Sequence, residues 1–139
     1  MIEEQPNLPV TADQLVAEVQ KLCTDGWRMV QIGVTTLGTT FEVNYSFDRL
    51  QIFRNLRVTL PVANARLPSV SGVYFCAFLY ENEIHDLFGI AFDGLVLDFK
   101  GHLYQTAQPF PFAQAPAPAA PAAKPAPAAP AAATQKPSA

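Results

Sequence analysis

Residues 41–48 read FEVNYSFD, and this stretch decides the fold. Its aromatic and β-branched residues alternate with polar ones, a period of two that predicts a strand with one apolar and one polar face. Residues 27–36 are also rich in strand-forming residues, and residues 55–60 alternate again until Pro61 ends the run. Gly38 predicts a hairpin turn between the first two runs. The sequence therefore predicts a three-stranded antiparallel meander whose polar face is largely exposed to water.

A helix is expected before these strands. Apolar residues recur at helical spacing over residues 12–24 and form one stripe. Thr11 and Gln14 have the spacing of a capping box, so we expect the Thr11 side chain to bond to the free amides of the first turn. Gly26 supplies the left-handed residue that ends a helix. One apolar stripe is enough for this helix to cover one face of the sheet.

A second helix is expected after Pro68. Ser69 or Ser71 can cap it, and it runs through residues 73–80 as far as Phe88, with Gly89 as its stop. The eight residues 73–80 are all apolar or aromatic and would surround two turns of helix. A helix that rests on a sheet at a monomer surface needs only a stripe. Part of this apolar surface should therefore be covered by a second neighbour.

The fold class that follows is α+β. We expect a small two-layer domain with a mainly antiparallel sheet of three to four strands and two helices. Residues 90–92, 95–99 and 103–104 could add one or two short strands.

Composition divides the chain into residues 1–112 and residues 113–139. The second part has 14 Ala and 7 Pro in 27 positions and no aromatic residue, so it is predicted to be a disordered tail. The first part has 7 basic and 12 acidic residues, hence a net charge of −5, which argues against binding to nucleic acid. No apolar run approaches the roughly 20 residues of a membrane span. Without a leader sequence, the default location is the cytoplasm.

The two cysteines do not predict a cofactor site. An iron–sulfur cluster normally takes four thiolates, and Cys23 and Cys76 lie 53 positions apart. Each cysteine lies on the apolar stripe of a predicted helix, so both are expected to be buried and to pack as small hydrophobic residues.

The densest polar cluster is residues 81–86, ENEIHD. Glu83 and Asp86 would share one helix face, and His85 lies between them, so a small metal-dependent hydrolase is one hypothesis. No second His or Cys is near enough in the sequence to complete a transition-metal site. The favoured hypothesis is that these carboxylates pair with basic groups of this chain or of a partner.

Residues 80–90, YENEIHDLFGI, resemble the signature of the C-subunit family of respiratory complex I and its hydrogenase relatives. That family has the pattern ERExxDxxG on its second helix. Asn82 stands where the family has Arg, which removes a fixed cation between Glu81 and Glu83.

The region after the motif is similar to the D subunit of energy-converting membrane-bound [NiFe] hydrogenases of the Ech type. Residues 93–104 are followed almost at once by residues 109–112, without the long basic segment typical of complex I members. This resemblance implies a non-catalytic structural subunit in a ferredoxin-linked, ion-translocating, hydrogen-evolving complex. A short C subunit of a NADH:quinone oxidoreductase is the alternative.

The resemblance also implies partners and a site. The chain would hold no cofactor and would pack on a large hydrogenase-type subunit with the [NiFe] centre, beside a small iron–sulfur subunit and membrane subunits. It would lie on the cytoplasmic, inner face of the cell membrane without spanning it. No catalytic or metal-binding residue is expected, and the motif supplies the predicted partner interface: Glu81, Glu83, His85, Asp86, Leu87, Phe88 and Gly89.

Overall fold

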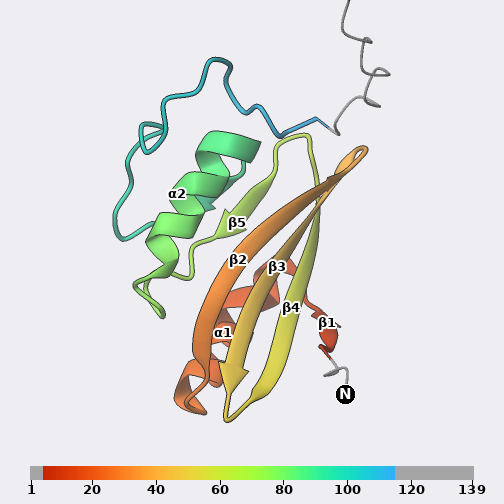
Figure 1. Ribbon diagram of the computed structural model, residues 1–139, viewed down its shortest axis with the longest axis vertical. Helices are drawn as coiled ribbons and strands as arrows, with labels where there is room; N and C mark the ends of the chain where they lie inside the picture. The colour runs from red at the N-terminus through yellow and green to blue at the C-terminus, as the bar shows by residue number, and fades with distance from the viewer. Residues whose placement is uncertain (1–4, 115–139) are drawn as a thin grey trace, which may run out of the picture.

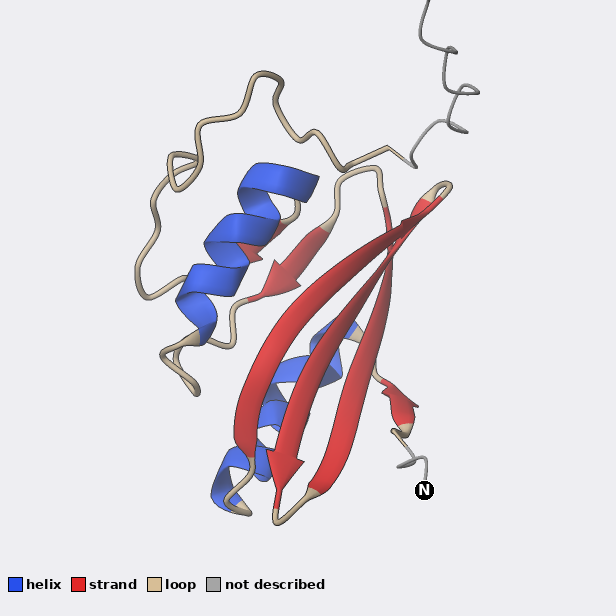
Figure 2. Ribbon diagram, viewed as in Figure 1, coloured by secondary structure: helices blue, strands red, loops and turns tan. Residues whose placement is uncertain are grey.

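The computed structural model describes residues 5–114 (Figures 1 and 2). The predicted tail lies outside the described residues from position 115 onward. Two helices and two small sheets confirm the α+β class. In chain order the elements are β1 (Asn7–Pro9), α1 (Ala12–Thr24), β2 (Arg28–Leu37), β3 (Thr40–Arg49), β4 (Ile52–Pro61), β5 (Arg66–Pro68), α2 (Ala77–Phe88) and β6 (Ala91–Asp93).

The predicted meander is confirmed, with one addition. Strands β2, β3 and β4 pair antiparallel in sequence order, and β1 adds to β4 in parallel, so the sheet order is β1-β4-β3-β2. The sheet is therefore mixed rather than purely antiparallel. Strand β1 has three residues and contains Pro9, which left no alternating pattern to recognise.

The core lies on one face of this sheet. Every second residue of β3 is fully buried there, and α1 packs against the same face through three apolar side chains. Figure 1 shows α1 behind the meander and α2 beside β2. The fully buried residues of β3 are Phe41, Val43, Tyr45 and Phe47, and the buried residues of α1 are Leu15, Val19 and Leu22.

Helix α1 has the predicted bounds, but its predicted capping box is wrong. Within the described part of the chain, the Thr11 side chain forms no capping hydrogen bond. The Gln14 amide instead donates to the Thr11 carbonyl oxygen at 3.1 Å. The helix ends at Thr24, and Gly26 just beyond it has φ of +79°, which confirms the expected left-handed stop.

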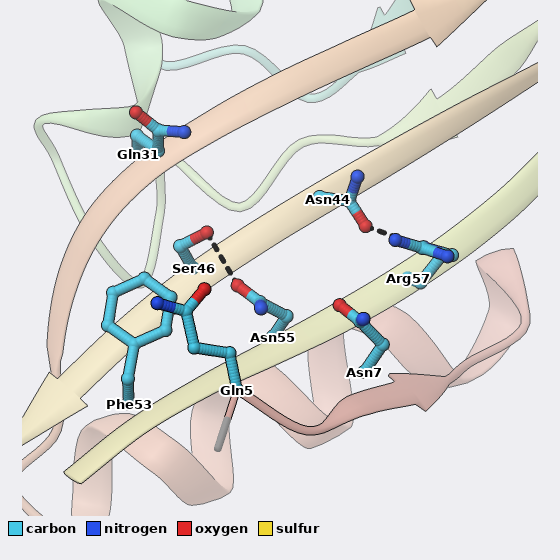
Figure 3. Close-up of a pocket in the computed structure, with 8 residues that line it drawn as sticks. All are labelled: Gln5, Asn7, Gln31, Asn44, Ser46, Phe53, Asn55 and Arg57. Atoms are coloured by element: carbon cyan, nitrogen blue, oxygen red, sulfur yellow. Dashed lines mark hydrogen bonds between the residues drawn. The ribbon is translucent and has the colours of Figure 1, made fainter. Parts of the chain in front are cut away.

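The opposite face of the sheet is polar, as the alternation predicts (Figure 3). Amide side chains from β1, β2, β3 and β4 surround a shallow depression of about 340 Å³. Ser46 donates to Asn55 at 2.7 Å, and the Arg57 guanidinium donates to Asn44 at 2.8 Å. Ser46 and Asn55 are 5% and 8% exposed, so neighbouring side chains cover this part of the polar face.

The second helix begins later than predicted. Residues 73–76 form turns, and α2 starts at Ala77 with Cys76 as its N-cap. Ser69 and Ser71 are not its caps. The apolar run therefore does not form one continuous helical surface: Ala77 is fully buried, whereas Phe75 is 60% exposed. Cys76 is exposed, which contradicts its predicted burial, because it precedes the helix instead of lying on its stripe.

A second, two-stranded sheet flanks α2. Strands β5 and β6 pair in parallel, with Arg66 and Asp93 joined by an ion pair of 2.7 Å. Strand β6 confirms the expected strand near residues 90–92. Residues 95–99 and 103–104 form no strand, so this prediction is wrong. Their backbone groups form hydrogen bonds with side chains of α2 and of the loop before it instead of pairing with another strand.

Candidate subunit interface

Glu81 faces inward from the first half of α2. Its side chain is fully buried, one carboxylate oxygen accepts a hydrogen bond of 2.7 Å from the Val70 amide, and the other accepts one from the Ser69 hydroxyl. Burial raises the pKa of Glu81, and the two hydrogen bonds oppose that rise. Within residues 5–114, no Lys or Arg forms an ion pair with it. Glu81 therefore fixes the loop before α2, and its burial does not fit the predicted direct contact with a partner.

Asn82 connects α2 to the segment that follows β6. It is 2% exposed, and its amide nitrogen donates to the carbonyl oxygens of Phe78 at 2.7 Å and Leu97 at 2.8 Å. Its side-chain oxygen accepts a bond of 2.9 Å from the Phe99 amide. A neutral side chain with both donors and an acceptor suits this position, since an arginine could not accept the Phe99 bond. Asn82, which replaces the arginine of the family pattern, thus holds the segment that contains Leu97 and Phe99.

Asp86 holds a later part of the same segment. It is 6% exposed, and one oxygen accepts a hydrogen bond of 2.9 Å from the Tyr104 amide. The His85 ring lies 3.3 Å from its other oxygen, and Glu83 reaches the Tyr104 hydroxyl at 3.4 Å. The negative charge of Glu83 raises the pKa of Tyr104, assisted by partial desolvation. These carboxylates mainly organise the chain itself.

The predicted metal-dependent site is not assembled. In the part of the chain that the structure describes, no three His, Cys, Asp or Glu side chains are placed to share a metal ion. Asp86 is committed to the Tyr104 amide, while Glu83 extends toward the Tyr104 ring. The geometry gives the hydrolase hypothesis no support.

The second half of α2 is covered by residues 109–113, which we call the strap. The Phe112 amide donates to the Leu87 carbonyl at 2.9 Å, and the Phe112 ring lies 5.7 Å from that of Phe88. Thr36 of β2 donates to the Phe112 carbonyl at 2.7 Å, so the strap also reaches the edge of the sheet. The strap therefore occupies part of the surface that the motif offers.

Gly89 ends α2 in the left-handed conformation, with φ of +77°, as the sequence predicts. The Phe110 ring of the strap lies directly over it. A Cβ atom at this position would be 3.0 Å from two carbons of that ring. Both the backbone angle and the close approach require glycine here.

The turn before α2 and the first half of the helix leave apolar side chains exposed. Phe75 and Leu79 are 60% and 49% exposed, and the Phe75 ring lies 4.9 Å from that of Phe78. The Phe78 ring lies 6.3 Å from Phe99, which belongs to the segment held by Asn82. We call the whole surface the aromatic patch; it consists of Phe75, Phe78, Leu79, Val96, Leu97 and Phe99.

The aromatic patch differs from the interface predicted from sequence. Of the predicted residues, Glu81, Asp86 and Gly89 maintain the local structure, and Leu87 and Phe88 contact the strap. Glu83 and His85 remain half-exposed. The excess of apolar residues at positions 73–80 was a signal for Phe75 and Leu79. The residues of the patch between 96 and 99 were missed because they were expected in a strand.

Comparison with known proteins identifies the family of this chain. The model of the family described as respiratory-chain NADH dehydrogenase, 30 Kd subunit, matches residues 8–104. The chain belongs to this family. The match confirms the resemblance carried by residues 80–90. The matched region begins in β1 and ends at Tyr104, so it includes the whole network around α2 and excludes the strap.

Curated relatives in this family match over shorter regions. The C subunit of NADH-quinone oxidoreductase from Jannaschia sp. (strain CCS1) is 42% identical over 73 residues, which are 45% of this chain and 34% of the relative. The C subunit of the same enzyme from Mycolicibacterium gilvum (strain PYR-GCK) is 30% identical over 101 residues, or 66% of this chain and 45% of the relative. The chain thus spans less than half the length of these relatives.

Solved structures share the fold. A chain of the membrane-bound sulfane sulfur reductase, an archaeal respiratory membrane complex, matches with a TM-score of 0.64 at 23% identity, over 71% of this chain and 62% of that one. A trypsin-resistant fragment of Nqo5, residues 1–134, matches with a TM-score of 0.56 at 23% identity, over 63% of this chain and 78% of the fragment. Among residues 5–114, neither helix has the length and hydropathy needed to cross a bilayer.

Proposed function

We propose that this family member is a non-catalytic structural part of a membrane-associated electron-transfer complex, and that it docks on the large subunit through the aromatic patch. The observation that supports this proposal is the exposure of five large apolar side chains of the patch, which range from 37% to 60%. The rings of Phe75, Phe78 and Phe99 are linked by contacts of 4.9 and 6.3 Å, and exposed aromatic surface of this kind is typical of protein–protein contacts. Glu83 and His85, half-exposed on the same helix, would lie at the polar rim of the contact.

The complex we favour is a NADH:quinone oxidoreductase. Both curated relatives described above are C subunits of NADH-quinone oxidoreductases, and one of them aligns with two thirds of this chain. In this assignment the chain holds no cofactor, and redox centres belong to the partner subunits. The chain would be attached peripherally, on the cytoplasmic side, through subunits that span the membrane.

An energy-converting hydrogenase of the Ech type is the second candidate. The observation that favours it is the strap, because residues 109–113 return to this chain's own α2 instead of extending toward a neighbour. In that case the large subunit would hold the nickel–iron centre, and a small iron–sulfur subunit would accompany it.

Co-purification distinguishes these assignments. The full chain, tagged and expressed in its native host, should recover a large subunit without nickel together with a NADH-oxidising flavoprotein. Recovery of a nickel-binding large subunit without the flavoprotein would favour the hydrogenase. A stable monomer that recovers no large subunit of either kind would refute the proposed function.

Variants of the aromatic patch test the docking surface itself. Replacing Phe75 and Leu79 by Ser should reduce recovery of the large subunit by about tenfold, because truncated interface aromatics commonly weaken binding by that much or more. Leu37→Ser is the matched control, since Leu37 is 50% exposed at the turn between β2 and β3. Thermal unfolding should show that all variants fold. Equal recovery with the patch variant and wild type would exclude the patch as the docking surface.

A further inference from the structure

The turn between β3 and β4 exposes an apolar side chain that the fold does not use. Arg49 pairs with Ile52, so Leu50 and Gln51 form a two-residue turn. Leu50 is 86% exposed, the most of any large hydrophobic residue in the described ranges, and Ile52 is 59% exposed. We call residues 49–52 the Leu50 tip. It lies at the foot of the meander in Figure 1, beyond Phe47, the last core residue of β3.

The backbone of this turn is unfavourable for its residues. Leu50 has φ of +49° and Gln51 has φ of +68°. Two-residue hairpins with positive φ at both positions prefer Asn-Gly, because other side chains crowd the backbone. The hairpin between β2 and β3 has a glycine, Gly38, at its positive φ of +59°. Leucine at the Leu50 tip is therefore a poor choice for the hairpin alone, and such strained positions concentrate at functional sites.

The tip also carries a positive charge. Arg28 pairs with Asp48 next to the tip, at the edge of a shallow depression of about 520 Å³. Asp25 and Arg49 line the same depression, and among residues 5–114 no carboxylate lies within 4.0 Å of the Arg49 guanidinium, so the charge of Arg49 is unpaired at the tip. A surface complementary to the tip would combine an apolar pocket with an acidic rim.

We propose that the Leu50 tip is a second docking anchor, whose leucine inserts into an apolar pocket with an acidic rim on another subunit of the complex. This inference rests on the proposed function, but it concerns a surface separate from the aromatic patch. Anchors of this kind are few, exposed before binding and fully buried afterwards. A lipid surface fits less well, because two apolar side chains and the charge of Arg49 are less than stable membrane attachment needs.

The test separates anchoring from hairpin geometry. A double variant with Leu50→Asn and Gln51→Gly should unfold at the same temperature as wild type or higher, because Asn-Gly suits this turn. In the native host, recovery of one subunit after a high-salt wash should fall about tenfold with this variant. Photo-leucine at position 50 should cross-link to that same subunit, at a site with apolar and acidic residues. Photo-leucine at position 37 is the matched control and should not cross-link to that subunit.

Other outcomes overturn the inference in distinct ways. Unchanged recovery with the double variant, or no cross-link from position 50 while the wild-type chain still recovers its partner subunits, would refute the anchor and leave the proposed function standing. A cross-link only to a second copy of this chain would also refute it. So would Leu50-dependent binding to vesicles of phosphatidylglycerol and phosphatidylethanolamine. If the wild-type chain recovers no subunit at all, the proposed function fails, and the anchor fails with it.

Discussion

The meander and the surroundings of α2 are stabilised in different ways. Strands β2, β3 and β4 are joined by long ladders of main-chain hydrogen bonds, with one register shift between Met29 and Gln31 of β2, and their apolar side chains fill the core. Around α2, three polar side chains hold irregular segments: Glu81 binds the loop before the helix, while Asn82 and Asp86 bind the segment after β6.

This difference determines how each region should fail. In the meander, the main-chain ladder does not depend on any one side chain, so a substitution acts through lost volume and affects the whole domain. Near α2, each polar side chain is the connection to a particular segment. Its removal should release that segment and leave the meander folded. The following predictions test this distinction.

Phe47→Ala should have the largest effect. Phe47 is fully buried on β3, and its ring lies 5.7 Å from that of Tyr74. Truncation should lower the free energy of unfolding by about 3–5 kcal/mol. Urea denaturation measures this loss, and the transition should remain a single step. Phe112→Ala is the matched control because Phe112 is 52% exposed, and it should cost much less. Similar losses for both variants would contradict the assignment of the core.

Asn82→Ala should act locally. It removes three hydrogen bonds from a buried amide, and the expected loss is about 1–3 kcal/mol. Hydrogen exchange should accelerate at the Phe99 amide and its neighbours, while amides of β3 stay protected. Asn44→Ala is the control, because its partner Arg57 is half-exposed and can bond to water. Uniformly faster exchange across the domain would show that α2 and the meander are not separable.

Gly89→Ala should cost about 1–2 kcal/mol, because an L side chain is unfavourable at positive φ. The new methyl group would also displace the Phe110 ring, which lies 3.0 Å from its position. NMR spectra should therefore show shifts in the strap. Gly72→Ala has no atom within 4 Å of the added Cβ and should leave stability and spectra unchanged. An unperturbed strap in Gly89→Ala would contradict the contact.

Glu81→Gln should produce the smallest change, visible as a dependence on pH. Burial raises the pKa of Glu81 above its ordinary value of 4.5, so the folded state holds this proton more tightly than the unfolded state does. The stabilisation from that proton is present below pH 4.5 and is lost as pH rises through the folded-state pKa. Unfolding from about pH 4 to 8 should show wild type losing stability relative to Glu81→Gln. The opposite trend would mean that the hydrogen bonds from Ser69 and Val70 outweigh desolvation.

The sequence was sufficient to predict those elements whose residue pattern lies within one helix or strand. Strict alternation predicted β3 and β4, and a single apolar stripe predicted α1 at residues 12–24, because both patterns follow from the geometry of one element. Strand β2 was predicted from its richness in strand-forming residues. Strands β1 and β5 have three residues each and end in proline, so only their distant parallel partners make them strands. The turn at Leu50 was missed because it lacks the Asn or Gly that usually mark such a turn.

The candidate site was harder to predict for the same reason. The family resemblance assigned Glu81 and Asp86 to a partner interface, while the residue pattern left open whether their partners belong to this chain or to another. They are buried because irregular segments of the same chain fold over them, and no periodic pattern specifies where such segments lie. The resemblance directed attention to α2, whereas the exposed residues on which the proposed docking surface rests are recognised only from the structure.

The parallel pairing of β5 with β6 makes α2 a crossover between two strands that meet only after the helix is complete. The partners of Asn82 and Asp86, and the strap, come later still along the chain. When synthesis has reached the end of α2, these partners are still missing from the chain. The surface formed by Phe75 and Phe99 can therefore form only after the segment beyond α2 has been synthesised.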